Sequence, residues 1–271
     1  MTLAGAMPLV AAEEPFVRWD WVWDHTDDFR EAFWEHLTLT AVSVGIGFAI
    51  SMALALVAVR WRWTFEPLAG FSGALYAVPS LALFGILLTI PWFGLGFRTA
   101  VTALVTYTLL ILLRNIVAGL DGVPAAAREA ADGMGYEPWR RMLRVDLPLA
   151  IPAIVAGLRI ATVTTVGLVT VTSLVGVGGF GGLINDGLSR NFSTPIVVGT
   201  VLSVALAVAF DLAFVVLERL VTPWSRARAD GGRGRRWGRG DRDQRAMLDA
   251  LNRTQHVERF VPRGGGVGAA P

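Results

Sequence analysis

The residues best placed to do chemistry lie in one polar segment between two long apolar runs. Its pattern is Glu129-Ala130-Ala131, then Gly135, and nine residues further on Val145-Asp146-Leu147-Pro148. The alanines leave a slim surface that fits into a groove, and directional charge is supplied by Arg128, Glu129, Arg140, Arg141 and Arg144. Charge placed in this way selects a protein partner more than it adds raw affinity. The segment therefore has the chemistry of a docking site, and the alternative is an ordinary capped turn between two membrane helices.

Two short helices are expected within this segment. Proline suits the first turn of a helix, where its missing N–H costs nothing, and Gly135 suits the left-handed position after a helix end. We therefore expect one helix from about Pro124 to Met134. A second helix is expected from Pro138 to Arg144, opened by proline and stopped before Pro148. Two short helices joined at a glycine form a compact knob.

Catalytic groups are not found in the apolar runs. The histidines, His25, His36 and His256, fall outside the expected membrane spans, and no H-E-x-x-H motif is present. A chain without lysine cannot hold a Walker-type G-x-x-x-x-G-K-[ST] loop, and a chain without cysteine has no thiolate metal site. The glycines of residues 176–182 lack a basic partner for phosphate, so we expect them to form a sharp turn. We predict no catalytic residue, no metal site and no cofactor bound by this chain.

Composition predicts an all-α integral membrane protein. Mean hydropathy is +0.53, and the apolar residues gather in runs near the ~20 that cross a bilayer. Lipid offers no hydrogen-bond partner to an open sheet edge, so the spans are expected to be helical. Five spans are expected, at about Leu37 to Val59, Leu68 to Ile90, Thr99 to Ile116, Leu149 to Val175 and Pro195 to Leu217.

Arginine, the only basic residue type besides histidine, predicts the orientation. Arginines gather between the first two spans, around the Glu129 segment, and from Arg219 to Arg263. The opposite side has only a few, namely Arg18, Arg30, Arg98 and Arg190. By the positive-inside rule, the Glu129 segment and the C-terminus are expected in the cytoplasm and the N-terminus outside.

Two ionisable residues fall within the expected spans and need partners there. Arg159 lies ten residues after Leu149, and Asp211 lies twelve residues before Pro223. At ~1.5 Å per residue both lie at a similar depth from the cytoplasmic side, so they are able to pair. Separate snorkelling, or exposure to a watery vestibule, is an equal alternative.

Hydroxyl side chains on the spans are candidates for lining a translocation path. In membranes such groups often bond only to their own helix or to a neighbour, which is the alternative for each of them. We select Thr164, Thr165 and Ser173, on the span after the Glu129 segment, together with Ser80.

Three regions of the chain differ in composition. Residues 1–36 are acidic and rich in tryptophan, which suits anchoring at the outer membrane interface; contact with an extracellular binding protein is the alternative. The start of the chain lacks the basic start and long apolar core of a cleavable signal. Residues 37–221 hold the spans. Residues 222–271 combine glycine and arginine, which predicts disorder and attraction to anionic lipid rather than nucleic-acid binding.

The Glu129 segment resembles the EAA loop of ABC importer permeases, whose motif is E-A-A, three residues, G, nine residues and I-x-L-P. Only Val145 departs from it, conservatively. The resemblance implies a type I importer core of five helices whose loop docks on a cytoplasmic ATPase, which binds ATP and Mg. It also implies a second permease subunit, identical or paralogous, an extracytoplasmic substrate-binding protein, and a bacterial inner membrane. The residues given an ATPase-coupling role are Glu129, Ala130, Ala131, Gly135, Arg140, Arg141, Leu147 and Pro148.

Further strings resemble the osmoprotectant branch of these permeases, which moves glycine betaine, choline and carnitine. They are Tyr76-Ala77-Val78-Pro79-Ser80-Leu81-Ala82-Leu83, Leu113-Arg114-Asn115 with Gly119-Leu120-Asp121-Gly122-Val123, and Leu174-Val175-Gly176-Val177-Gly178-Gly179-Phe180-Gly181. Methionine permeases share a similar core and glycine-rich turn, so an amino-acid importer is the alternative. A passive channel or an intramembrane enzyme is the alternative of another class, although a channel needs no ATPase-docking knob.

Overall fold

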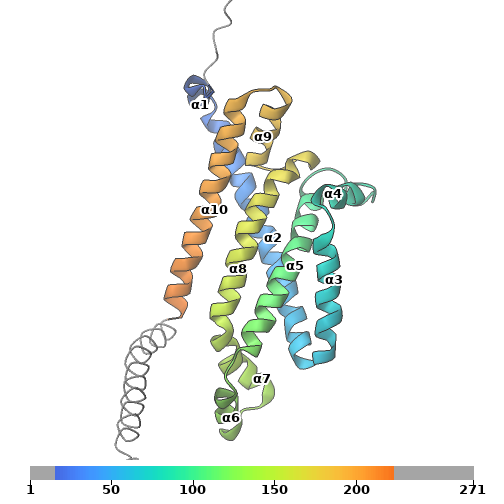
Figure 1. Ribbon diagram of the computed structural model, residues 1–271, viewed down its shortest axis with the longest axis vertical. Helices are drawn as coiled ribbons and strands as arrows, with labels where there is room; N and C mark the ends of the chain where they lie inside the picture. The colour runs from blue at the N-terminus through green and yellow to red at the C-terminus, as the bar shows by residue number, and fades with distance from the viewer. Residues whose placement is uncertain (1–15, 223–271) are drawn as a thin grey trace, which may run out of the picture. The chain divides into compact units, whose positions relative to one another are not determined.

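The computed structural model describes residues 16–222, and the expectations for residues 1–15 and for the tail from residue 223 on lie outside this part. Within it, helices follow one another with short connections (Figure 1). They are α1 (Trp19–Asp24), α2 (Thr26–Arg60), the 3₁₀ turn η1 (Arg62–Thr64), α3 (Phe65–Ala77), α4 (Ser80–Leu88), α5 (Phe97–Asp121), α6 (Ala125–Gly133), α7 (Pro138–Arg141), the π turn η2 (Met142–Asp146), α8 (Leu147–Val169), the 3₁₀ turn η3 (Thr170–Val175), α9 (Phe180–Ser189) and α10 (Ser193–Val221).

Four helical stretches of residues 16–222 are long and apolar enough to cross a membrane, and the bent pair of α3 and α4 raises the number to as many as five. The helix of the first span is longer than expected, because α2 begins at Thr26 and runs through residue 36 without a break. Asp27 and Asp28 lie in its first turn, where negative charge favours the positive end of the helix dipole.

The second span, expected from Leu68 to Ile90, is not one continuous helix. The helical segments on the two sides of Val78 and Pro79 are bent by 92°. Val78 has extended backbone angles, φ −65° and ψ 127°, because a proline ring disfavours the α conformation of the residue before it. This stretch is therefore a broken span or a re-entrant pair of helices.

The helix expected from Pro138 was predicted to end before Pro148, and this prediction is wrong. α7 continues through the π turn η2 into α8, so helical backbone runs from Pro138 to Val175. In a regular α-helix, proline has no N–H to donate and its ring clashes with the carbonyl of the residue four positions earlier. The π turn widens the helix just before Pro148, with the Leu147 N–H donating to the carbonyl of Met142, and so relieves this clash.

α2, α5 and α8 pack against one another at the centre of the bundle, with α3 against α5 and α10 against α8 (Figure 1). Glycine allows α5 and α8 to approach closely: a Cβ atom on Gly157 would lie 2.5 Å from the Cβ of Asn115, and one on Gly119 would lie 2.8 Å from the Cβ of Ala153. Small residues at such contacts are typical of membrane helices, which associate through close packing. The long span α8 is therefore held firmly against α5.

The sharp turn expected at the glycine cluster is present between η3 and α9. Gly176 and Gly179 have positive φ angles of 87° and 51°. The Gly179 N–H donates to Glu35 of α2 at 2.8 Å. The imidazole of His36 lies against the ring of Phe180, with centroids 5.1 Å apart. The first turns of α2 thus hold the start of α9.

Candidate functional site

The polar segment of residues 124–148 forms α6, α7 and η2 at one end of the bundle (Figure 1). α6 ends in the left-handed turn predicted at Gly135, whose φ is 79°. The Gly135 N–H donates to the Asp132 carbonyl at 2.9 Å, and the Tyr136 N–H donates to the Ala131 carbonyl at 3.1 Å. These two hydrogen bonds form a Schellman motif, which fixes how the chain leaves α6.

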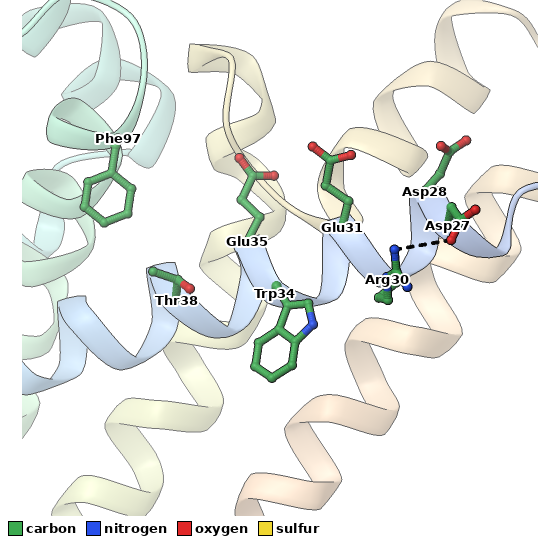
Figure 2. A pocket seen from close by; sticks show the side chains of 8 residues that line it. All are labelled: Asp27, Asp28, Arg30, Glu31, Trp34, Glu35, Thr38 and Phe97. Atoms are coloured by element: carbon green, nitrogen blue, oxygen red, sulfur yellow. Dashed lines mark ion pairs between the residues drawn. The ribbon is translucent and has the colours of Figure 1, made fainter.

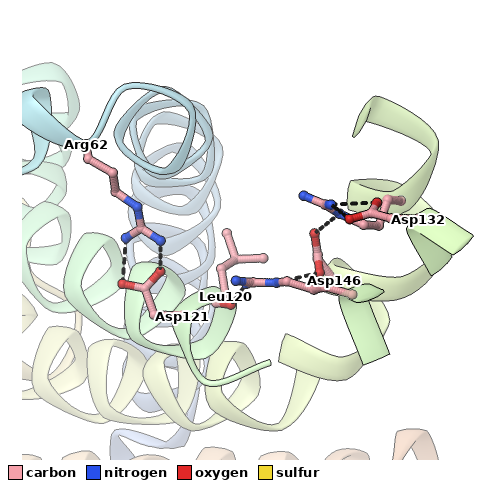
Figure 3. Close-up of polar contacts among 7 residues, drawn as sticks. Arg62, Leu120, Asp121, Asp132 and Asp146 are labelled. Atoms are coloured by element: carbon pink, nitrogen blue, oxygen red, sulfur yellow. Dashed lines mark hydrogen bonds and ion pairs between the residues drawn. The ribbon is translucent and has the colours of Figure 1, made fainter. Parts of the chain in front are cut away.

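Asp146 is the centre of an ion-pair network that joins the short helices (Figure 3). Its side chain is only 3% exposed. Its Oδ1 lies 3.1 Å from the Nε of Arg128 on α6, and its Oδ2 lies 3.5 Å from the Nε of Arg141 on α7. A buried carboxylate needs such partners, because an unpaired buried charge is strongly destabilising.

Both arginines of this network make a second contact. The Nη2 of Arg128 donates to the Leu120 carbonyl in the last turn of α5 at 2.5 Å. The Nη1 of Arg141 donates to both carboxylate oxygens of Asp132 on α6, at 2.7 and 2.6 Å. α5, α6, α7 and the start of α8 are therefore joined through four charged side chains.

A separate ion pair ties the same end of α5 to the connection between α2 and α3. Arg62 of η1 donates to Asp121 through both of its terminal nitrogens, at 2.7 and 2.5 Å (Figure 3). These side chains are 56% and 40% exposed, in contrast to Asp146. Solvent-exposed pairs contribute little to stability, so this pair fixes geometry more than it stabilises the fold.

The outer surface of the segment combines the charge of Glu129 with large apolar side chains. Glu129 is exposed and forms no ion pair within residues 16–222. Met134, Trp139 and Leu143 are 69%, 60% and 56% exposed. Clustered exposed apolar groups mark a protein or membrane interaction site.

The structure divides the residues predicted for coupling into two groups. Ala131 is 1% exposed and lies inside the knob. Arg141, which was expected to supply surface charge, is turned toward Asp132 and Asp146 instead. Arg140 lies over the ring of Trp139 at 5.8 Å. Glu129, Ala130 and Gly135 are exposed on α6 and at its terminal turn, whereas Leu147 and Pro148 are half-buried at the start of α8.

Asp132 and Asp146 were missed as members of this site, and Arg128, which was expected to supply charge to a partner, binds Asp146 and the Leu120 carbonyl instead. Arg128 and Asp132 are four residues apart, so they share one face of α6, which is a signal for a charged pair. They do not pair with each other, because each is engaged by a residue beyond the turn at Gly135. The partners follow from the tertiary arrangement and not from the helix spacing.

Arg159 and Asp211, predicted as a pair within the membrane, are in contact. The Nε of Arg159 donates to the Oδ1 of Asp211, and its Nη2 donates to Oδ2 at 2.7 Å. The two side chains are 38% and 35% exposed on the surface of the described chain. This two-point pair joins α8 to α10.

The hydroxyl groups selected for a translocation path lie on α8, on η3 and at the start of α4. Thr165 donates to the Ala161 carbonyl at 2.7 Å, and Ser173 donates to the Thr170 carbonyl at 3.0 Å. Both hydroxyls are thus bound to their own helix, which is the alternative interpretation. Thr164 is half-buried on α8, and Ser80 opens α4 beyond the bend. Their role in transport stays a prediction.

An acidic cavity of about 590 Å³ lies beside the first turns of α2, at the end of the bundle near α9. Asp28, Glu31 and Glu35 extend to the same side of α2, with Phe97 of α5 across from them (Figure 2). Arg30 pairs with Asp27 at 3.4 Å. Within residues 16–222, no group of three or more His, Asp or Glu side chains is arranged to hold a metal ion.

A chain of membrane-spanning helices with an exposed knob at one end of the bundle has the architecture of the membrane subunit of a multi-subunit transporter. The chain belongs to the family described as binding-protein-dependent transport system inner membrane components, which matches residues 45–223. It is therefore a permease subunit of an ABC importer and a component of the inner membrane.

Two relatives show the similarity of sequence. The osmoprotectant import permease protein OsmW of Salmonella typhimurium is 35% identical over 162 residues, 58% of this chain and 74% of that protein. The glycine betaine/carnitine/choline transport system permease protein OpuCB of Bacillus subtilis is 38% identical over 154 residues, 57% of this chain and 70% of that protein. The predicted resemblance to the osmoprotectant branch is thereby confirmed.

The fold is also found in a solved transporter. A chain of the MetNI methionine ABC transporter in an inward-facing conformation aligns with a TM-score of 0.65, covering 76% of this chain and 100% of that chain. The sequence identity is 22%, so the likeness concerns the fold alone. The predicted type I importer core is confirmed.

Proposed function

We propose that this permease subunit imports quaternary ammonium osmoprotectants such as glycine betaine, choline or carnitine. The observation that carries the proposal is the 35% to 38% identity with permeases named for osmoprotectant, glycine betaine, carnitine and choline transport. Methionine import has weaker support, because the likeness to the methionine transporter is at 22% identity and concerns the fold.

The α6–α7 segment is proposed as the docking site for a cytoplasmic ATPase, which binds ATP and Mg. Its exposed Glu129, Met134 and Trp139 offer one charge and apolar surface to a groove, and the Schellman turn at Gly135 presents them on a fixed backbone. The proposal puts this end of the bundle and the C-terminus in the cytoplasm, and the N-terminus outside. The arginine distribution supports this orientation.

The remaining partners follow from the same proposal. A second permease subunit, identical or paralogous, completes a path that a single bundle does not enclose. An extracytoplasmic binding protein delivers the solute, as the family description implies for its members. The first turns of α2, with the acidic cavity at Asp28, Glu31 and Glu35, lie on the side where that protein would approach.

Uptake by proteoliposomes tests the substrate. The chain is reconstituted with the ATPase and the binding protein of the same transporter, and labelled glycine betaine, choline, carnitine and methionine are offered with and without ATP inside. The expected result is ATP-dependent uptake of at least one quaternary ammonium compound. Uptake of methionine alone overturns the substrate proposal, and uptake without ATP indicates a passive channel.

Labelling of single cysteines tests the orientation, because the natural chain contains no cysteine. Ala126→Cys places a thiol on exposed α6, and Asn185→Cys places one on exposed α9. In intact cells, a membrane-impermeant maleimide is expected to label Asn185→Cys and to label Ala126→Cys only after permeabilisation. The reverse pattern contradicts the proposed orientation.

A further inference from the structure

We propose that Asp146 is the positioning residue of the α6–α7 segment, through which a displacement of α6 and α7 is passed to the membrane span α8. The inference deepens the proposed function and rests on it for the source of that displacement. Asp146 itself is too deeply buried, at 3% exposure, to contact an ATPase. Any effect of Asp146 on transport must therefore act through the groups that it holds.

The contacts of Asp146, direct and through its two arginines, reach α5, α6 and α7. One carboxylate oxygen holds Arg128, which also binds the Leu120 carbonyl at the end of α5. The other holds Arg141, which also binds Asp132 on α6. Asp146 is the last residue of η2 and directly precedes α8. A displacement of α6 or α7 is therefore transmitted through charged side chains to Asp146, the residue that directly precedes α8, and not only through the connecting backbone.

The π turn explains how Arg141 and Asp146 can meet within one continuous helix. In an α-helix, each residue turns the chain by about 100°, so residues five apart point about 140° away from each other. In a π turn the N–H of residue i+5 donates to the carbonyl of residue i, so the turn holds more residues than an α-helical turn and residues five apart come closer to the same side. The Leu147 N–H to Met142 carbonyl bond is of this kind. The π turn therefore favours the ion pair of Arg141 with Asp146.

The positive and negative charges of the network are equal in number, so each substitution leaves a defined charge without its partner. Two arginines, Arg128 and Arg141, face two carboxylates, Asp132 and Asp146. Asp146→Asn leaves Arg141 with Asp132 but strands the charge of Arg128. The double variant Asp146→Asn with Arg128→Gln is neutral again and keeps the Arg141–Asp132 pair. Stranding a charge is destabilising, whereas removing both partners is often neutral.

The matched control is Asp121→Asn. It removes the carboxylate of another Arg–Asp pair at the end of α5, the pair with Arg62, whose side chains are 56% and 40% exposed. It leaves all contacts of Asp146 in place. If losing any ion pair at this end of the bundle impairs the protein, Asp121→Asn shows the defect as well. If the defect is specific to Asp146, Asp121→Asn does not show it.

The first measurement is the distance between spin labels at Ala126→Cys on α6 and Ile160→Cys on α8, both exposed, in the full-length chain in nanodiscs. It requires no knowledge of the solute. A narrow distribution is expected for the parent and for Asp121→Asn, and a broad one for Asp146→Asn and for the double variant. A narrow distribution in the double variant overturns the proposal.

The second measurement is the number of solute molecules imported per ATP hydrolysed by the reconstituted complex, with glycine betaine, choline and carnitine as probes. We expect a fall of at least about fivefold for Asp146→Asn with retained ATPase binding, typical of a lost coupling between sites. The double variant is expected to recover thermal stability and not the import per ATP. Recovery of both assigns Asp146 a structural role only and overturns the proposal. If the parent complex imports none of the probes, the substrate proposal fails, and the spin-label result still decides the role of Asp146.

Discussion

At the α6–α7 end of the bundle, helices are joined by long charged side chains, whereas at the α9 end they are joined by glycines that let backbones touch. A Cβ atom on Gly181 would lie 2.1 Å from the carbonyl oxygen of Thr170, and one on Gly178 would lie 2.4 Å from the backbone nitrogen of Ser173. At the other end, the guanidinium of Arg128 bridges α6, Asp146 and the end of α5. Long side chains can adjust their angles while they keep their contacts, and packed backbone atoms cannot.

This difference suggests a division of labour between the two ends. The α9 end is close-packed and also holds the first turns of α2 through Glu35 and His36. The α6–α7 end presents exposed surface on a framework of ion pairs. The end that is proposed to receive motion is therefore built from contacts that survive small displacements, whereas the close backbone contacts at the α9 end do not survive them.

The largest effect is expected from Gly181→Ala at the α9 end. The added Cβ collides with the backbone of Thr170, and overpacking of this kind costs about 3 kcal/mol or more. The measurement is thermal unfolding in detergent, with Gly182→Ala as control, because a Cβ at Gly182 meets nothing within 4 Å. Equal unfolding temperatures for the two variants would show that the two backbones are not in contact.

A smaller but clear loss is expected when the pair between α8 and α10 is broken. Arg159→Ala or Asp211→Ala strands the other charge within the membrane, so each single variant is expected to yield less folded protein than the double variant. Size-exclusion profiles of the three variants check this order. A double variant worse than both single variants contradicts a direct partnership and favours separate roles for the two side chains.

A loss of about 1 kcal/mol is expected from Gly135→Ala in the turn after α6. Space is not the cause, because a Cβ there meets nothing within 4 Å, but the φ of +79° disfavours any side chain. The control is Gly133→Ala in α6, where alanine is expected to stabilise the helix. Unfolding in detergent measures both, and a neutral Gly135→Ala would mean that the turn rearranges without cost.

The smallest effect on folding, and the clearest on assembly, is expected from Glu129→Lys. Because Glu129 is exposed, its substitution is expected to change the unfolding temperature no more than an ordinary surface substitution does. Pull-down of the ATPase is expected to weaken by about tenfold if Glu129 meets a basic groove. Glu66→Lys on α3 controls for the added positive charge. Equal recovery of the ATPase by both variants excludes Glu129 from the contact.

The sequence by itself determined the membrane class, most of the helical spans and the position of the polar segment that forms α6 and α7. These features depend on local quantities, namely runs of apolar residues long enough to cross a bilayer, and the order of proline, alanine and glycine around Glu129. Gly135 was predicted correctly as left-handed for the same reason, since a glycine after a short helix is a local signal.

Only the tertiary structure decided how the segment is joined to the spans. Arg128 and Asp146 are 18 residues apart, and Glu35 and Gly179 are 144 apart, so no spacing rule pairs them. Pro148 appeared to end a helix because the prediction treated proline within a regular α-helix, whereas the chain widens into a π turn there. That turn brings Arg141 onto the side of Asp146, and a side chain expected on the surface became part of the network around this buried carboxylate. The pairing of these charges is set by which helices pack together, and that packing is a property of the whole bundle.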